Sequence, residues 1–142
     1  MNKARCEFIS KSINEGFARN VAAAFLLQFD PTVDFMADVK TDVSEAVTNA
    51  IVHGYKEKQG DVILELSETD GIFTVAVEDY GCGIEDVEKA MQPLYTTNAD
   101  EERSGMGFTV MQMFMDTVDV VSEKNKGTRI VMTKNLSEPK FV

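Results

Sequence analysis

The 142-residue sequence contains no tryptophan, one histidine and two cysteines. Cys6 and Cys82 lie far apart, so no zinc-site spacing is present, and both thiols are interpreted as reduced. No apolar run approaches the roughly 20 residues that cross a membrane, and the polar N-terminus lacks the apolar block of a signal peptide. These absences predict a cytoplasmic protein without a membrane segment.

Basic residues are also scarce. Lys and Arg number 14 against 24 Asp and Glu, which gives a net charge of −10. Because a nucleic-acid-binding surface needs clustered positive charge, direct nucleic-acid binding is not expected. An acidic chain is compatible with a basic protein partner, although charge alone does not establish one. The hydrophobic content of 44% and the length indicate a single globular domain over residues 1–142.

Hydrophobic periodicity predicts helices and strands in an order dominated by hairpins. The expected helices cover residues 14–29, 33–54, 85–91 and 106–116, with an irregular loop over residues 92–104. The expected strands cover residues 5–10, 62–67, 72–78, 118–122 and 128–133. Because hairpins outnumber strand–helix–strand units, the chain is predicted to be α+β: a two-layer sandwich whose mainly antiparallel sheet is covered by helices on one face. A doubly wound nucleotide-binding fold is not expected.

One candidate group lies on the second expected helix. Glu45, Asn49 and His53 are four residues apart and would share one helical face. An amide oxygen is a hard, neutral ligand suited to Mg²⁺ beside phosphate oxygens. A glutamate one turn earlier could accept a proton from an attacking hydroxyl. A solvated polar face would look the same, and this segment alone favours that plainer interpretation.

A second group ends the strand over residues 72–78. Asp79 is followed by Gly81 and Gly83. The carboxylate could accept a hydrogen bond from a purine amino group, and the two glycines could let a flat ring approach the backbone. Cys82 lies between the glycines and is interpreted as a small filler, since no basic residue adjoins it. A simple strand end with a glycine turn is the alternative.

The last two groups adjoin one another. An irregular stretch over residues 92–104 is often a functional lid, or else plain disorder. It leads into Arg103-Ser104-Gly105-Met106-Gly107, where two glycines precede an apolar helical run. Glycines at a helix start leave N–H groups free for phosphate, and an arginine adds a charged donor. The alternative is a hinge before an ordinary core helix.

Together the four groups supply the parts of one ATP site: a metal ligand with a base, a purine acceptor, a lid and a phosphate nest. The sequence contains no Gly-x₄-Gly-Lys-Ser/Thr motif and no His-Arg-Asp or Asp-Phe-Gly signature. The site would therefore belong neither to the P-loop proteins nor to the common protein kinases.

These motifs, in this order, resemble the GHKL ATPase superfamily with its Bergerat ATP-binding fold. Glu45-x₃-Asn49 is similar to the N box, and Asp79-x-Gly81-x-Gly83 and Arg103-Ser-Gly-Met-Gly107 are similar to its two glycine boxes. Over almost the whole chain the resemblance is closest to the anti-sigma serine kinases, and among them to those of sporulation. The strings that carry it include Val43-Ser-Glu-Ala-Val-Thr-Asn-Ala-Ile-Val-His-Gly-Tyr55 and Gln92-Pro-Leu-Tyr-Thr-Thr97.

The resemblance implies a homodimer that sequesters a sporulation sigma factor from RNA polymerase in the presence of ATP or ADP and Mg²⁺. It also implies a serine protein kinase that phosphorylates and inactivates an anti-anti-sigma protein. By motif, Glu45 would be the general base, Asn49 the Mg²⁺ ligand, and Asp79 the adenine acceptor beside Gly81 and Gly83. The remaining nucleotide contacts would come from Thr97, Arg103, Ser104, Gly105, Met106, Gly107 and Thr128. Arg19 sits where the family contacts its partners, although unaided it would be interpreted as a solvated helix arginine.

Two other functions stay open from the sequence. One is a stress-response anti-sigma kinase with the same chemistry and a different sigma factor. The other is a non-catalytic, nucleotide-gated binding module, against which Glu45 argues because a pure binder needs no base at that position.

Overall fold

The computed structural model describes residues 1–92 and 99–136, with the backbone alone over residues 99–106. Its helices are α1 (Asn14–Leu27), α2 (Val33–Thr48), η1 (Asn49–Gly54), α3 (Val87–Met91) and α4 (Ala99–Phe114). Its strands are β1 (Asn2–Ile9), β2 (Asp61–Thr69), β3 (Ile72–Asp79), β4 (Thr117–Glu123) and β5 (Gly127–Asn135). Within these described residues, no helix is long and apolar enough to cross a membrane.

The strands form one sheet in the order β1-β2-β3-β5-β4, and every pairing is antiparallel. The β2–β3 hairpin turns at Asp70-Gly71, where both residues have positive φ, 52° and 81°. This is the backbone that a two-residue hairpin loop requires, and an Asp-Gly pair adopts it readily. The predicted hairpins and the predominance of antiparallel pairing are confirmed.

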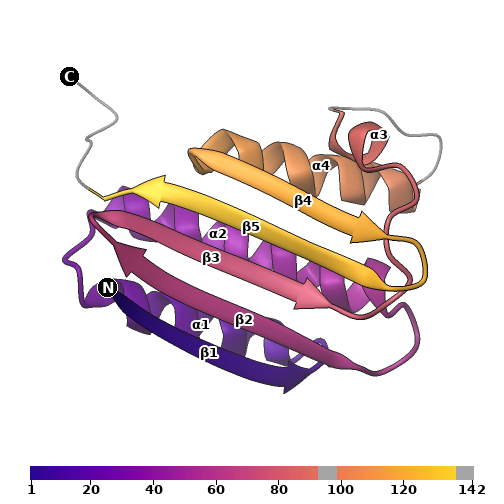
Figure 1. Ribbon diagram of the computed structural model, residues 1–142, viewed down its shortest axis with the longest axis horizontal. Helices are drawn as coiled ribbons and strands as arrows, with labels where there is room; N and C mark the ends of the chain where they lie inside the picture. Colours follow the sequence, from indigo (N-terminus) through magenta and orange to yellow (C-terminus); the bar gives the residue numbers. More distant parts are fainter. Residues whose placement is uncertain (93–98, 137–142) are drawn as a thin grey trace.

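Helices α1, α2 and α4 lie on one face of the sheet, behind it in the view of Figure 1. Between the two layers is a core built from alternate strand residues and from one stripe of each helix. Fully buried members include Leu26, Val39, Val43, Val47, Leu64, Leu66, Phe73, Phe108, Met111 and Met132. The two-layer α+β prediction is therefore confirmed.

The second expected helix changes type partway along. It begins after Thr32, whose side chain caps it by accepting from the Phe35 N–H at 3.1 Å. At Asn49 the α-helix gives way to the π-helical segment η1, and the Tyr55 N–H donates to the Ala50 carbonyl five residues earlier. A π-turn widens the helix and rotates the side chains that follow it. The expected α-helical spacing thus holds from Glu45 to Asn49 and ends there.

The last helix begins earlier than the sequence predicts. We expected a loop over residues 92–104 and a helix from Met106, but α4 starts at Ala99. The segment from Ala99 to Arg103 is rich in good helix formers, and these outweigh the cost of two glycines, roughly 1 kcal/mol each. Gly105 and Gly107 lie inside α4, where helical N–H groups donate to carbonyls of the preceding turn. The expected helix tip at Met106 is therefore wrong for this structure.

Candidate functional site

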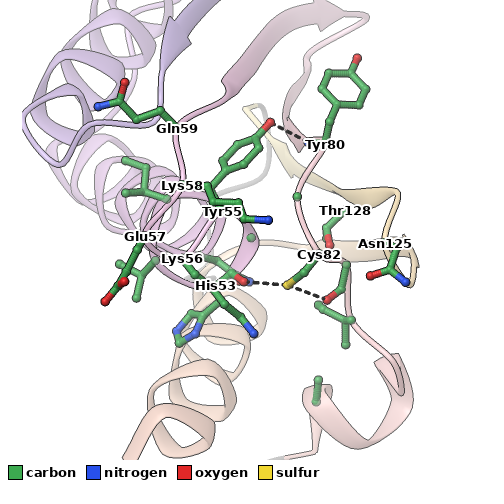
Figure 2. A pocket seen from close by; sticks show the side chains of 18 of the residues that line it. His53, Tyr55, Lys56, Glu57, Lys58, Gln59, Tyr80, Cys82, Asn125 and Thr128 are labelled. Atoms are coloured by element: carbon green, nitrogen blue, oxygen red, sulfur yellow. Dashed lines mark hydrogen bonds between the residues drawn. The ribbon is translucent and has the colours of Figure 1, made fainter.

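An open pocket of about 1710 Å³ lies at the end of β3, between η1, the β3–α3 connection and α4. Its wall includes residues from the predicted groups and from the loop before β2, as Figure 2 shows. The residues that line it include Asn49, His53, Gly54, Tyr55, Lys56, Lys58, Tyr80, Gly81, Cys82, Gly83, Lys89, Asn125 and Thr128.

The N-terminal wall comes from η1. Asn49 and His53 both line the pocket, although they lie on a π-helix, and Glu45, which the spacing put on the same face, does not line it. Gly54 ends η1, and its carbonyl oxygen accepts from the Cys82 N–H at 2.8 Å. The segment that carries the predicted metal ligand is thereby joined to the first glycine pair.

Asp79 lies behind Gly54 and Gly81 and, like Glu45, is not among the residues that line the pocket. Its side chain is buried, with 5% of the residue exposed, and the backbone N–H groups of Gly81 and Thr128 donate to its carboxylate. Burial raises the pKa of Asp79 to about 6, and these two N–H groups oppose the shift. A buried carboxylate that keeps free acceptor positions can recognise an amino group, because it offers about four lone-pair sites.

Gly81 and Gly83 are required by the protein's own backbone. A Cβ on Gly81 would lie 2.0 Å from the Gly54 carbonyl oxygen. Gly83 has a φ of +74°, and a Cβ there would lie 2.1 Å from the carbonyl oxygen of Glu123. We expected these glycines to admit a ligand ring, but the closest atoms around them belong to the chain itself. Their first role is to let η1 and the β4–β5 turn approach the end of β3.

The thiol between these glycines has a structural contact. The Sγ of Cys82 donates to the His53 carbonyl oxygen at 3.1 Å, drawn as a dashed line in Figure 2. Asn125, in the β4–β5 turn, donates its N–H to the Cys82 carbonyl at 2.7 Å. These contacts fit the interpretation of Cys82 as a small filler.

Glu45 lies beside the pocket and not among the residues that line it. Its carboxylate faces α4, because a Cβ built on Gly107 would come within 3.2 Å of Glu45 Oε2. Burial raises the pKa of Glu45, and the nearby negative charge of Glu15 raises it further. A half-buried carboxylate with a raised pKa can take up a proton more readily than a fully solvated one.

Arg19 is linked to the helix that carries Glu45. Its Nη1 donates to Glu15 Oε1 at 3.0 Å and to Ser44 Oγ at 3.3 Å. The Arg19 side chain remains 38% exposed, so its guanidinium can still reach an external group. The solvated arginine expected from the sequence alone is thus partly held between α1 and α2.

Several predicted residues cannot be placed in the same way. Thr97 lies outside the described residues. Arg103, Ser104, Gly105 and Met106 are described only as backbone of α4. Thr128 lies at the pocket wall, where its hydroxyl is 2.8 Å from Ser122 Oγ. The structure therefore brings Asn49, Gly81, Gly83 and Thr128 to the wall of one pocket, and the N–H groups of Gly81 and Thr128 donate to the buried Asp79 carboxylate.

Sequence reasoning missed other residues of this wall. Tyr55 is buried, and its hydroxyl contacts both Asp61 and Tyr80. Lys56, Lys58 and Lys89 bring basic side chains into the pocket of an acidic protein. Tyr55 and Lys56 directly follow His53-Gly54 in the sequence, and this position next to a predicted group is a signal that could have indicated them.

The donor set is compatible with a divalent cation shared with phosphate. Mg²⁺ is often bound through one or two protein oxygens together with phosphate oxygens and water. Asn49 offers one such oxygen at the pocket wall. Among the described residues, no three His, Cys, Asp or Glu side chains gather into a separate metal site.

The sequence has clear relatives among proteins of known family. Residues 12–134 match the family described as histidine kinase-like ATPase domain. The anti-sigma F factor of Clostridium kluyveri is 59% identical over 133 residues, which cover 94% of each chain. The anti-sigma F factor of Clostridium perfringens is 55% identical over 137 residues, 96% of this chain and 98% of that one.

The chain belongs to the anti-sigma F factor family, within the histidine kinase-like ATPases. Solved structures share its fold. The RsbU and RsbW domains of a Mycobacterium tuberculosis protein superpose with a TM-score of 0.70 at 17% identity, over 98% of this chain and 34% of that chain. The histidine kinase domain of Erythrobacter litoralis EL346 gives 0.57 at 21% identity, over 87% and 61%. At these identities the likeness extends to the fold alone.

Proposed function

We propose that this protein is an ATP-dependent anti-sigma factor and serine protein kinase. In this proposal it sequesters a sporulation sigma factor from RNA polymerase. It also transfers phosphate from ATP to a serine of an anti-anti-sigma protein and thereby inactivates that protein. The observation that carries the proposal is the pocket lined by Asn49 and Gly81, behind which the buried Asp79 carboxylate accepts from the Gly81 N–H.

Two further observations support the proposal. The relatives that are more than half identical over nearly the whole chain are named anti-sigma F factors. That name favours a sporulation sigma factor over a stress-response one. The family is described as an ATPase domain, which fits a pocket lined by Asn49, a candidate metal ligand, and by Gly81, whose N–H donates to the buried Asp79 carboxylate.

The proposed chemistry follows from the two sides of the site. Asp79 would accept from the adenine amino group, and Gly81, Gly83 and Thr128 would form the wall beside the base. Asn49 would hold Mg²⁺, which when bound neutralises charge on the phosphates. Further phosphate contacts would come from Thr97, Arg103, Ser104, Gly105, Met106 and Gly107.

Glu45 would act as the general base. Its raised pKa suits a group that receives the proton of a serine hydroxyl as that oxygen attacks the terminal phosphate of ATP. Because its carboxylate lies against the middle of α4 at Gly107, the acceptor serine would have to enter beside this helix, or the helix would have to shift.

The proposed partners are a sigma factor, an anti-anti-sigma protein and a second copy of this chain, all in the cytoplasm. Arg19 would contribute to partner binding, since its partly exposed guanidinium lies next to Ser44 and hence one residue from Glu45. A partner docked there would bring an acceptor serine close to the base.

A non-catalytic, nucleotide-gated module is the second candidate. The observation in its favour is that the Glu45 carboxylate lies against α4 and is not among the residues that line the pocket. Such a module would bind nucleotide and sigma factor without transferring phosphate.

One experiment separates these functions. The purified protein is incubated with terminally labelled ATP, Mg²⁺ and a candidate anti-anti-sigma protein, with and without sigma factor. Label on a serine of the anti-anti-sigma protein is the expected result. A stable, nucleotide-dependent complex with sigma factor and no label would support the module. No binding of adenine nucleotide by the folded protein would exclude both.

A further inference from the structure

The ladder between β2 and β3 stops at the pocket. Its last pair is Val62 and Asp79, so Asp61 and Tyr80 would pair next if the ladder continued. A side-chain hydroxyl lies between these two residues instead. The Tyr80 N–H donates to Tyr55 Oη at 2.8 Å, and Tyr55 Oη donates to the Asp61 carbonyl at 2.5 Å. Figure 2 shows the first of these bonds as a dashed line.

The hydroxyl is firmly held in this position. Tyr55 is only 8% exposed, and a Cβ on Gly60 would lie 2.3 Å from Cε1 of its ring. Burial raises the pKa of the Tyr55 hydroxyl, so the group stays protonated and keeps its hydrogen to donate. One O–H therefore serves as donor to one strand and acceptor from the other.

Inserting an oxygen atom between two strands moves them apart. A direct bond between N and O spans about 2.9 Å, whereas the path through the hydroxyl is nearly twice as long. Beyond this point the chain of β3 leaves β2 and approaches η1. There Gly81 donates to Asp79 Oδ1 at 2.9 Å, and the Cys82 N–H donates to the Gly54 carbonyl.

We propose that Tyr55 is a positioning residue for base recognition. By holding the Tyr80 N–H away from Asp61, its hydroxyl sets the direction of the chain that carries Asp79 and Gly81. The inference rests on the proposed function, because it assigns to Tyr55 the geometry with which Asp79 would accept from an adenine amino group. Tyr55 itself would not contact the base.

The test compares Tyr55→Phe with the wild-type protein in binding ADP and IDP. The two nucleotides differ at the purine 6-position, where ADP has an amino donor and IDP has a carbonyl acceptor. We expect the wild type to prefer ADP by about tenfold or more, since a site built around a hydrogen bond rejects the analogue that lacks it. Loss of the hydroxyl should reduce this preference for ADP by about fivefold. Without it, the Tyr80 N–H can bond directly to the Asp61 carbonyl, and this would change the orientation of Asp79.

Ser10→Ala is a matched control. Ser10 is also buried, and its hydroxyl accepts from the Gly60 N–H at 3.0 Å, on the β1 side of the same loop. Its removal costs one hydrogen bond of this loop, where Tyr55→Phe costs two, and it does not touch Tyr80. We expect its ADP-to-IDP preference to equal that of the wild type, while both variants lose some thermal stability.

The outcomes are distinct. Equal weakening of ADP and IDP binding in Tyr55→Phe, with an unchanged preference, would make Tyr55 merely structural and overturn the inference alone. A wild type that binds neither nucleotide would overturn the proposed function and the inference together. Hydrogen exchange of the Tyr80 amide gives a second measurement. This N–H should be protected in the wild type, and rapid exchange would show that it does not donate to the Tyr55 hydroxyl.

Discussion

The two sides of the pocket are built differently. On the sheet side, Gly81 and Gly83 pack so closely on the backbone of Gly54 and Glu123 that no Cβ fits. On the α4 side, Gly107 is an interior helix residue, and a Cβ there would meet only the flexible end of the Glu45 side chain, at 3.2 Å.

This difference separates two reasons for a glycine. Packing demands Gly81 and Gly83, so the fold alone accounts for them. Packing does not demand Gly107, and a glycine inside a helix costs roughly 1 kcal/mol against alanine. A functional role on the α4 side explains the presence of Gly107 better than packing does. This agrees with the proposed phosphate contacts there, and the following predictions test the contrast.

The largest effect on stability is expected from Gly81→Ala. The new Cβ would overlap the Gly54 carbonyl oxygen, and backbone on both sides would have to shift. We expect the free energy of unfolding to fall by about 3 kcal/mol, the upper range for forced overpacking. Urea denaturation measures it.

Gly16→Ala in α1 is the control, because a Cβ there would make only an ordinary contact, 3.6 Å from Arg19 Nη2. If Gly81→Ala unfolds at the same urea concentration as the wild type, the sheet side is less constrained than we infer.

Glu45→Gln should have the largest effect on activity. The amide keeps the shape of the side chain but cannot receive the serine proton, so phosphate transfer should slow by more than about tenfold, or about 1.4 kcal/mol. Nucleotide affinity should be retained. The measurement is transfer of label to the anti-anti-sigma protein under single-turnover conditions.

Glu123→Gln serves as its control, since Glu123 pairs with Lys126 on the exposed β4–β5 turn. Undiminished transfer by Glu45→Gln would exclude Glu45 as the base.

Nucleotide affinity should depend on pH through Asp79. Its pKa is raised from 3.8 to about 6, and only the ionised carboxylate offers all its oxygen lone pairs to the adenine amino group. We expect ADP to bind about tenfold more weakly at pH 5 than at pH 7. Calorimetry at both pH values checks this, and Asp79→Asn should bind weakly with little dependence on pH.

The same group gives stability the opposite pH dependence. Between pH 3.8 and about 6 the folded protein holds a proton that the unfolded chain has released. The contribution of Asp79 therefore favours the folded state at low pH and is lost as the pH rises through about 6. A wild type whose stability difference from Asp79→Asn is constant from pH 4 to pH 7 would contradict the burial of this carboxylate.

The smallest effect is expected from Gly107→Ala. Alanine is the better helix former, so stability should rise by up to about 1 kcal/mol, less any cost of moving the Glu45 side chain. Nucleotide affinity should fall, because the added methyl group lies where the backbone would approach phosphate. Thermal unfolding and ADP titration measure the two effects. A variant that is less stable but binds ADP with unchanged affinity would show that packing, and not nucleotide binding, requires Gly107.

Much of the fold could be predicted from local signals. Thr32 caps α2 as its position before an amphipathic run suggests, and Asp70-Gly71 makes the expected hairpin turn. The ranges 62–67, 72–78, 118–122 and 128–133, expected as strands, lie within β2, β3, β4 and β5. Periodicity erred at element ends: β1 begins at Asn2 and α4 at Ala99, because charged residues that pack poorly can still extend a strand or a helix.

The sequence indicated which segments meet at the candidate site, and their arrangement less well. The motif around Asn49 and Asp79 pointed to one pocket, and these segments do meet. The sequence could not show that Glu45 faces Gly107, or that Asn49 begins a π-helix. Both depend on how one element packs on another.

The sequence by itself determined the strands, the helices, the face that each buries and the residue types available for chemistry, because these follow from local periodicity and capping. Only the tertiary structure decided why Gly81 must be glycine and what Tyr55 contacts. Those answers depend on segments about 25 residues apart, such as Tyr55 and Tyr80, lying within hydrogen-bonding distance. No pattern of neighbouring residues encodes such an approach, because it is fixed by the packing of the whole sheet against its helices.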